Sequence, residues 1–212
     1  MDKSIQTTIK NLEKNNICAY FAETKKDVIP LLKNLLGDGC SVSVGGSVTL
    51  SECGIPEFLK TGDYNYIDRY DPALDKAAVR EVFVRALGAD AYITSSNAIT
   101  EDGRLFNVDG NGNRIAALCF GPKSVIVIAG KNKIVKTIEE AQLRVKTVAA
   151  PKNCQRLSCN TYCSKTGSCA AKDEPFGGCD SKDRICSTYV VTSYQRNAGR
   201  IKVIIVDENL GY

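Results

Sequence analysis

The chain has 212 residues, of which 43% are hydrophobic and 25% are charged, close to the proportions of folded soluble proteins. These values exclude wholesale disorder, and the length suits one domain or one domain with an extra module. The net charge of +4 is spread along the chain and is too small to indicate nucleic acid or a membrane surface as a partner. The sequence has no histidine, which excludes histidine-based triads, zincins and imidazole proton shuttles.

No apolar run approaches the roughly 18 residues that are needed to cross a bilayer. The polar start of the sequence, MDKSIQTTIKN, lacks the apolar stretch of a secretory signal. We therefore expect a cytoplasmic protein that does not span a membrane.

The spacing of apolar residues predicts strands and helices that alternate along the chain. Strands are predicted over residues 18–22, 41–44, 64–67, 91–94 and 124–129. Helices are predicted over residues 4–14, between Thr24 and Gly37 with a kink or a shifted start at Pro30, over 75–87, and over 134–148 with a stop near Pro151. Residues 97–112 are rich in turn formers, and residues 188–194 and 201–206 are predicted to form a hairpin.

This alternation predicts an α/β fold with a mostly parallel sheet and helices on both faces. We expect a single domain over residues 1–212, because no repeat or low-complexity linker interrupts it. Within that domain, residues 151–187 are expected to form a cysteine-rich, metal-binding insertion before the last strands.

Six of the ten cysteines fall between Cys154 and Cys186, with the spacing C-x4-C-x3-C-x5-C-x9-C-x6-C. This segment has few large apolar side chains, so a core of its own cannot offset the roughly 1–2 kcal/mol per residue that ordering its backbone costs. Thiolates on a metal or disulfides are the available means of holding it.

In a reducing cytosol a metal site is favoured, with disulfides or redox switching, and unligated thiols, as the alternatives. Iron–sulfur is favoured over zinc, because the spacing lacks the paired C-x2-C knuckles of structural zinc sites. Six cysteines exceed the four that either site needs, so two of them are spare.

Candidate ligand-binding residues follow two predicted strands, where ligands of open α/β sheets collect. Gly45-Gly46-Ser47 and Thr49 follow the strand over 41–44, and free backbone N–H groups there favour an anion, although two glycines often form only a tight turn. After the strand over 91–94 come Asn97, Glu101, Asn113 and Arg114. Arg114 could bind a carboxylate or phosphate in bidentate fashion and Glu101 could serve acid–base or covalent chemistry, or all of these residues could simply cap turns.

Taken together, these stretches resemble the lactate-utilization (LUD) domain family over nearly the whole chain. The resemblance rests on VGGSVTLSECGI, GADAYITSSNAITEDGRLFNVDGNGNRIAAL, FGPKSVIVIAGKNKIV and the ending RIKVIIVDENLGY. It implies a fold similar to that of ribose-5-phosphate isomerase and the CoA transferases. It also implies a pocket lined by Gly45, Gly46, Ser47, Thr49, Asn97, Glu101, Asn113 and Arg114.

The short members of that family have a cysteine pattern close to T-P-C-x2-T-G-x-C-x2-C-x6-C, which this sequence resembles around residues 161–186. The resemblance implies a ligand set of Cys163, Cys169, Cys179 and Cys186 for an iron–sulfur cluster, with a 4Fe–4S cluster favoured and zinc as the alternative. Tyr162 replaces the usual proline, and the longer gap before Cys179 leaves room for Cys154 or Cys159 to take its place.

The first function that we consider is a lactate-utilization-like iron–sulfur subunit or enzyme that acts on a small 2-hydroxy acid. Its partners would be a small carboxylate or other anionic substrate and a redox partner subunit, because the chain lacks a G-x-G-x-x-G fingerprint for a nicotinamide or flavin of its own. We expect no nucleic-acid or membrane partner, and a homo-oligomer is compatible with the sequence.

Two alternatives remain open from the sequence. The chain could be a metal-stabilised protein that binds a small anion or senses oxidants without catalysis. It could also be an isomerase or a CoA or acyl transferase of the same superfamily with Glu101 or Glu52 active, although a shared fold alone does not establish this.

Overall fold

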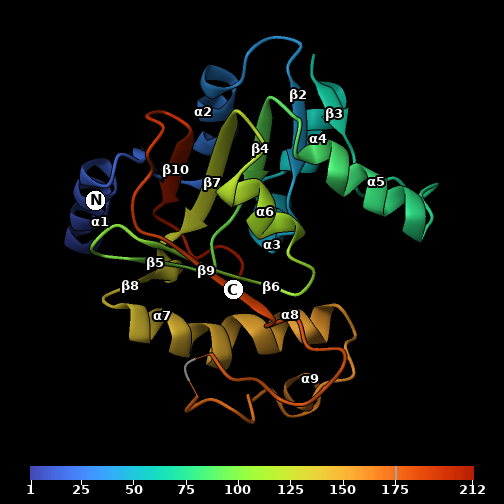
Figure 1. Cartoon of the computed structure of the whole chain (residues 1–212). Helices are drawn as coiled ribbons and strands as arrows, with labels where there is room; N and C mark the ends of the chain where they lie inside the picture. Colours follow the sequence, from blue (N-terminus) through green and yellow to red (C-terminus); the bar gives the residue numbers. More distant parts are fainter. Residues whose placement is uncertain (175) are drawn as a thin grey trace.

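The computed structural model describes residues 1–174 and 176–212 and is built around a central sheet of six parallel strands (Figure 1). The strands lie in the order β1-β10-β7-β4-β2-β3. Parallel strands that are buried on both faces consist of continuous apolar runs, and the central strand β7 is of this kind. The strands are β1 (Cys18–Ala22), β2 (Ser41–Val44), β3 (Asn65–Ile67), β4 (Ala91–Thr94), β7 (Ser124–Gly130) and β10 (Ile201–Val206).

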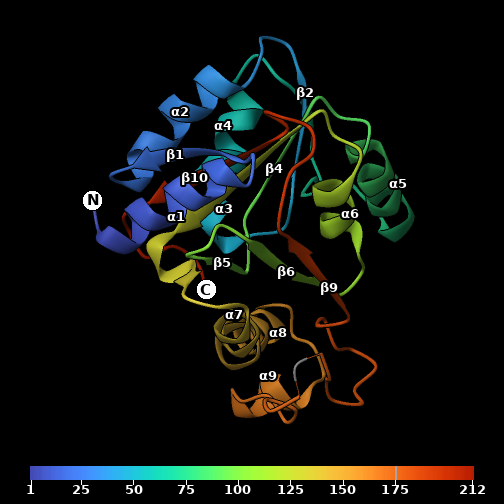
Figure 2. The same ribbon diagram turned by 60° about the vertical axis from the view of Figure 1, so that its left-hand side comes forward.

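Helices cover both faces of this sheet, as the sequence predicts (Figure 2). Alternate residues of β7 serve the two faces, with Ile126 and Ile128 in one hydrophobic core and Val125 and Val127 in the other. The first core is covered by α2 (Val28–Leu35), α3 (Val48–Glu52) and α4 (Ile55–Thr61), and the second by α1 (Lys3–Lys14) and α6 (Asn113–Cys119). The predicted α/β fold class is therefore confirmed.

The helix α5 (Lys76–Ala86) packs beside the β3 edge of the sheet. Asp75 caps its start by accepting a hydrogen bond from Ala78 N (2.8 Å), as the predicted start at residue 75 implies. Val82 packs near Ile67 in a small separate cluster.

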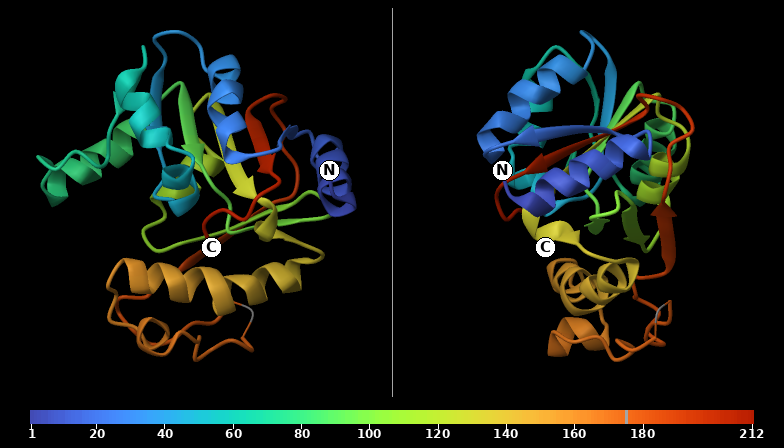
Figure 3. Two further views of the ribbon diagram at one scale, coloured as in Figure 1. Left: turned by 180° about the vertical axis from the view of Figure 1, so that it is seen from behind. Right: turned by 90° about the vertical axis from the view of Figure 1, so that its left-hand side faces the viewer.

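A second, four-stranded sheet lies at the carboxyl ends of the central strands, between them and the long helical rod of α7 and α8 (Figures 1 and 3). Its order is β8-β5-β6-β9, and β5 and β6 are antiparallel. Ala98 and Phe106 of this sheet pack against Ala141 and Val145 of the rod. Its strands are β5 (Ala98–Thr100), β6 (Leu105–Asp109), β8 (Ile134–Val135) and β9 (Thr188–Thr192).

This second sheet corrects two predictions. Residues 97–112 form the β5–β6 hairpin rather than a run of turns, because their apolar residues are buried in the layer between the sheet and the rod. The predicted hairpin of residues 188–194 with 201–206 is wrong: β9 pairs with β6, whereas β10 lies between β1 and β7. The strand β10 is almost entirely buried and suits the centre of a sheet, whereas β9 is half-exposed and suits an edge.

The helix predicted over 134–148 starts later and ends later in the structure. Residues 134–135 form β8, and α7 (Ile138–Arg144) starts at Thr137, whose side chain accepts a hydrogen bond from Glu140 N. The helix does not stop near Pro151, because a π-helical turn (Val145–Ala149) precedes it and places Pro151 at the start of α8 (Ala150–Arg156). Proline is tolerated in the first turn of a helix, where its missing N–H is not needed.

The helix after Thr24 has a shifted start rather than a kink at Pro30. A 3₁₀ turn (Lys25–Asp27) comes first, and α2 begins at Val28, so that Pro30 lies in its first turn. None of the described helices is both long enough and apolar enough to span a membrane.

The turn between β5 and β6 is fastened to α1, and Gly103 makes this contact possible. Gly103 has φ of +83°, and a Cβ there would lie 2.5 Å from the backbone carbon of Asn11. The side chains of Asn11 and Asn15 donate to backbone oxygens of this turn at 2.7 Å and 2.9 Å.

We predict that Gly103→Ala lowers the free energy of unfolding by more than about 2 kcal/mol, because it adds a clash with α1 to the strain of a left-handed residue. Gly39→Ala is the matched control: its φ is +65°, but a Cβ there meets nothing within 4 Å, so only the strain of about 1–2 kcal/mol applies. Urea unfolding of both variants measures the difference. Equal losses would contradict the proposed contact.

Candidate functional site

A cavity of about 470 Å³ lies at the carboxyl ends of the central strands. The chain continues from β2 to β3 on one side and from β4 toward β7 on the other, so the strand order reverses between β2 and β4. Ligands of open α/β sheets bind in the crevice at such a point. Ser47 after β2 and Asn97 after β4 line this cavity, and Asn153 of α8 and Ile185 before β9 line its other side.

Basic side chains outnumber acidic ones in the lining of this cavity, which we call the cationic cavity. An anionic ligand, such as a carboxylate or phosphate, is the class that such a lining favours. The basic residues are Arg69, Arg114, Lys133, Arg156, Lys182 and Arg184, and the acidic ones are Asp109 and Asp183.

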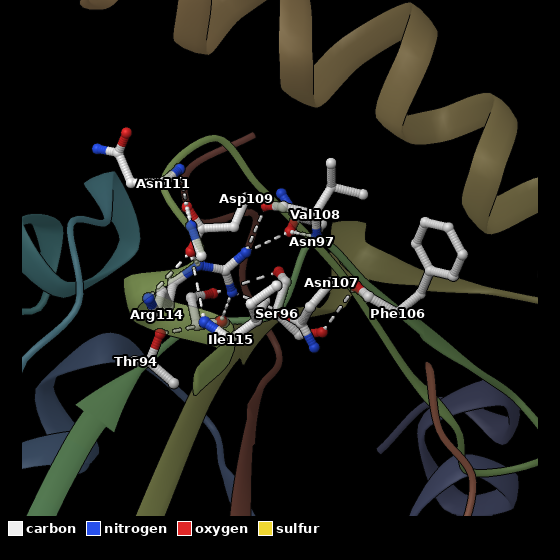
Figure 4. A network of polar contacts seen from close by, with 12 residues as sticks. Thr94, Ser96, Asn97, Phe106, Asn107, Val108, Asp109, Asn111, Arg114 and Ile115 are labelled. Carbon is white, nitrogen blue, oxygen red and sulfur yellow. Dashed lines mark hydrogen bonds and ion pairs between the residues drawn. The ribbon is translucent and has the colours of Figure 1, made fainter. Parts of the chain in front are cut away.

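Arg114 is surrounded by protein oxygens (Figure 4). Its Nη1 donates to the backbone oxygen of Ser95 (3.0 Å) and to Asn107 Oδ1 (2.6 Å). Its Nη2 donates to Asn97 Oδ1 (2.7 Å) and to the backbone oxygen of Val108 (2.8 Å). Four of the five guanidinium N–H groups are thereby used inside the protein.

The remaining edge of Arg114 faces Asp109, with Nε 3.9 Å from Oδ2. Burial lowers the pKa of Arg114, whereas Asp109 and Tyr92 raise it, and an arginine stays charged in any case. The sequence suggested that Arg114 binds a ligand through two parallel hydrogen bonds. In the structure, each edge of the guanidinium already faces protein oxygens, so none is free for a ligand. Arg114 instead fixes the floor of the cavity.

The structure brings most of the predicted ligand-binding residues together, since Gly46, Ser47, Thr49, Asn97 and Asn113 all line the cationic cavity. For the residues after β2 and β4 this position follows from the parallel sheet, because the carboxyl ends of its strands meet at one edge. Asn113 arrives there at the start of α6, after β6 of the second sheet.

Gly45 lies outside this lining and serves the packing of the strand ends. A Cβ at Gly45 would lie 2.8 Å from Thr94 Oγ1 and 3.2 Å from the Tyr92 hydroxyl. Its backbone N–H donates to the oxygen of Ile93 (2.8 Å). A side chain here would push the end of β2 away from β4.

Glu101, the predicted acid–base residue, is placed apart from the cationic cavity. It lies in the turn between β5 and β6, where its Oε1 accepts a hydrogen bond from Ser4 Oγ of α1 (2.7 Å). From the sequence we expect Asn97, Glu101 and Arg114 to lie together at one edge of the sheet. The β5–β6 hairpin separates them. Asn97 and Arg114 stay at its base, while Glu101 is carried to its tip.

Sequence reasoning missed Lys133, a lining residue of the cavity with only 3% of its surface exposed. It ends a 3₁₀ turn (Lys131–Lys133) that follows β7. Its Nζ donates to Thr49 Oγ1 and to Ser95 Oγ, each at 2.8 Å. The position of a lysine at the carboxyl end of a fully buried strand is the signal that could have found it.

Arg69 was missed as well and is the basic residue with the freest guanidinium in the lining. It follows β3, and its guanidinium carbon lies 4.7 Å from the centre of the Phe83 ring and 5.5 Å from that of Tyr70. Within the described residues it donates no hydrogen bond and forms no ion pair. Stacking thus holds Arg69 in place while its N–H groups remain available.

A second, small cavity lies in the cysteine-rich segment and is lined by five thiols, which we call the thiol cavity. It contains all four of the predicted metal ligands. Cys159 is absent from its lining. The five cysteines are Cys154, Cys163, Cys169, Cys179 and Cys186.

The five thiols line a common space, but they are not arranged as the ligands of a metal ion. Among residues 1–174 and 176–212, no three cysteine or carboxylate side chains converge where they could hold a metal ion. Burial, and next Cys163, raise the pKa of Cys154 to about 12. Burial also raises the pKa of Cys186, and the nearby Cys169 and Cys179 act in the same direction.

Two cations hold the backbone around the thiol cavity. Lys146, in the π-helical turn, is 3% exposed, and its Nζ donates to the backbone oxygens of Ala171 (2.6 Å), Glu174 and Gly177 (3.0 Å). Arg184 donates to the backbone oxygens on either side of it in the chain, those of Cys179 (3.3 Å) and Cys186 (2.9 Å). Arg184 lines both cavities, so the two spaces are adjacent.

Because Arg114 donates hydrogen bonds to four protein oxygens, we predict that Arg114→Met lowers the free energy of unfolding by roughly 3 kcal/mol or more. The same substitution at Arg80, whose side chain is 76% exposed, should change it by less than about 0.5 kcal/mol. Chemical denaturation of the two variants tests this role. A small loss for Arg114→Met would return Arg114 to the ligand-binding residues.

A comparison with a solved structure supports this fold. No curated protein matches the sequence significantly. A DUF162 family protein from Deinococcus radiodurans has a similar structure, with a TM-score of 0.54, 16% identity and coverage of 96% of both chains. Ribose 5-phosphate isomerase A from Methanocaldococcus jannaschii is more distant, with a TM-score of 0.36, 15% identity and coverage of 55% of this chain and 56% of that one. The family model described as LUD domain matches residues 5–206, and the chain therefore belongs to the LUD domain family.

Proposed function

We propose that this chain is a redox component of lactate utilization that binds a small 2-hydroxy or 2-oxo acid in the cationic cavity. We further propose that it holds an iron–sulfur cluster, of the 4Fe–4S type, in the thiol cavity. The observation that carries the proposal is the adjacency of the two spaces, which share Arg184 and Ala150 in their linings.

The donor set of the thiol cavity fits such a cluster in number and chemistry. Soft thiolates are the preferred ligands of iron–sulfur clusters, and the cavity offers one thiol more than the four required. Cys163, Cys169, Cys179 and Cys186 would hold the cluster, with Cys154 as the alternative to Cys179.

Two buried donors without an acceptor support the same assignment. In the described part of the chain, Arg184 Nε and the Tyr189 hydroxyl are buried and have no hydrogen-bond partner. Both lie close to Cys186, and burial, followed by Cys186, raises the pKa of Tyr189 to about 12. Buried donors normally find acceptors, and thiolate or sulfide sulfur in this cavity would supply them.

The cationic cavity supplies recognition of the acid. Arg69 presents an unpaired guanidinium that suits a carboxylate, and Arg156 and Lys182 add positive charge on the opposite wall. A bound iron–sulfur cluster would supply one-electron transfer, and a partner subunit would supply the cofactor that takes the hydride. The chain itself binds and orients the acid beside the electron carrier.

The transferase and isomerase alternatives gain no support from the site. Both carboxylates that they would use lie outside the lining of the cationic cavity. Glu101 is bound to α1, and Glu52 accepts a hydrogen bond from the backbone of Gly211 (2.7 Å).

For the cluster, we predict that Cys163→Ser and Cys186→Ser each lose most of the bound iron and sulfide, because removal of one thiolate opens the site. Cys18→Ser and Cys40→Ser should retain both, because Cys18 starts β1, Cys40 precedes β2, and neither lines the thiol cavity. Iron and sulfide content and the visible absorption of anaerobically purified protein, before and after dithionite, measure the outcome. A colourless protein with stoichiometric zinc would contradict the iron–sulfur proposal.

For the acid, we predict that Arg69→Gln weakens the binding of lactate and pyruvate by at least about tenfold, the loss of roughly one charge-assisted hydrogen bond. Lys10→Gln, which removes an exposed charge on α1, should leave the affinity unchanged. Titration calorimetry provides the dissociation constants. Equal weakening by both substitutions would show that only the overall charge matters.

A further inference from the structure

Lys133 is a buried amine whose contacts are incomplete for an ammonium ion. Thr49 Oγ1 and Ser95 Oγ accept its two hydrogen bonds at 2.8 Å. Both hydroxyls can do so because their own protons point elsewhere, toward the backbone oxygens of Leu210 (3.3 Å) and Ser96 (3.5 Å). No further protein atom in the described residues accepts a hydrogen bond from Nζ.

This geometry matches a neutral amine, which has two N–H groups and one lone pair. An ammonium ion would have a third N–H group, for which the described residues offer no acceptor. The lone pair of the neutral amine likewise has no contact among the described residues. Since Lys133 lines the cationic cavity, a ligand in that cavity is the partner available to it.

The C-terminal residues keep the space beside the amine open. Gly211 has φ of +59°, and a Cβ there would lie 2.5 Å from Thr49 Oγ1 and 3.5 Å from Lys133 Nζ. A larger residue would disturb the hydroxyl that orients the amine and would narrow the approach to it.

The charged surroundings favour the same protonation state. Burial, and then the positive charges of Arg144 and Arg114, lower the pKa of Lys133 to about 7. Glu52 and Cys53 act in the opposite direction but more weakly. A lysine that is desolvated and lies near other cations is a nucleophile at neutral pH.

We propose that Lys133 is a catalytic nucleophile that forms an imine with the carbonyl carbon of a 2-oxo acid bound in the cationic cavity. This deepens the proposed function and rests on it, because a 2-oxo acid is the product of oxidation of a 2-hydroxy acid. Arg69 would hold the carboxylate while the carbonyl carbon lies against Nζ.

The reaction needs no oxidant or reductant. The Lys133 nitrogen adds to the carbonyl carbon, an N–C bond forms as the C–O double bond opens, and the oxygen takes the proton that the nitrogen releases. Loss of this oxygen as water, with the second amine proton, leaves a C=N bond. Once protonated, the imine draws electrons from the neighbouring carbon and makes its C–H protons acidic, so such a site can exchange or transfer them.

The test uses the full chain, purified anaerobically, and pyruvate as the probe. Borohydride added after a short incubation should reduce the imine to a stable secondary amine, and peptide mass spectrometry should place the adduct on Lys133. Lys133→Met should lose the adduct, whereas Lys131→Met, which removes an exposed lysine paired with Asp207, should retain it. The rate should rise about tenfold per pH unit below 7 and level off above it, because only the neutral amine reacts.

Lactate gives a control that does not depend on the folding of a variant. It has no carbonyl to trap but should occupy the same site, so it should slow adduct formation in the wild-type protein. If calorimetry shows that pyruvate binds but no adduct forms on Lys133, the imine is refuted and the proposed function stands. If neither pyruvate nor lactate binds, the proposed function fails together with it.

Discussion

The buried guanidinium of Arg114 is the interaction on which the candidate site depends. It joins the residues after β4, through Ser95 and Asn97, to the strand β6, through Asn107 and Val108. A buried charge is tolerated only when it is well hydrogen-bonded, so these oxygens must stay where they are. The small sheet is thereby fixed over the carboxyl edge of the large one, and the space between them becomes the cationic cavity.

The same constraint sets the chemistry of Lys133. The backbone oxygen of Ser95 accepts a hydrogen bond from Arg114, and its hydroxyl oxygen accepts one from Lys133, so one residue positions both side chains. Burial, then the charge of Arg144 and then that of Arg114, disfavour a positive charge on the amine. The structural Arg114 and the reactive Lys133 therefore depend on the same residue, Ser95, for their positions.

The cysteine-rich segment follows a different principle. It has little apolar surface to bury, and its described backbone is instead held by Lys146 and Arg184, which donate to backbone oxygens around the thiol cavity. The segment also forms a wall of the cationic cavity through Ile185 and Arg184. A metal centre in the thiol cavity would therefore stabilise the wall of the ligand site, which couples the two parts of the proposed function.

The sequence by itself determined the α/β class, the strands of the central sheet, the helices α1, α2 and α5, and the residues that follow β2 and β4, but it did not predict the short helices α3, α4 and α6. The predicted elements depend on hydrophobic periodicity and on turn residues, which are local properties of the chain. It could not determine that residues 97–112 fold into a hairpin that carries Glu101 away, or that β9 and β10 belong to different sheets. Nor could it determine that Arg114 donates its hydrogen bonds to protein oxygens, while Arg69 and Lys133 are available to a ligand. Those outcomes depend on which distant groups become neighbours, and only the tertiary structure sets the burial and the hydrogen-bond partners of a side chain.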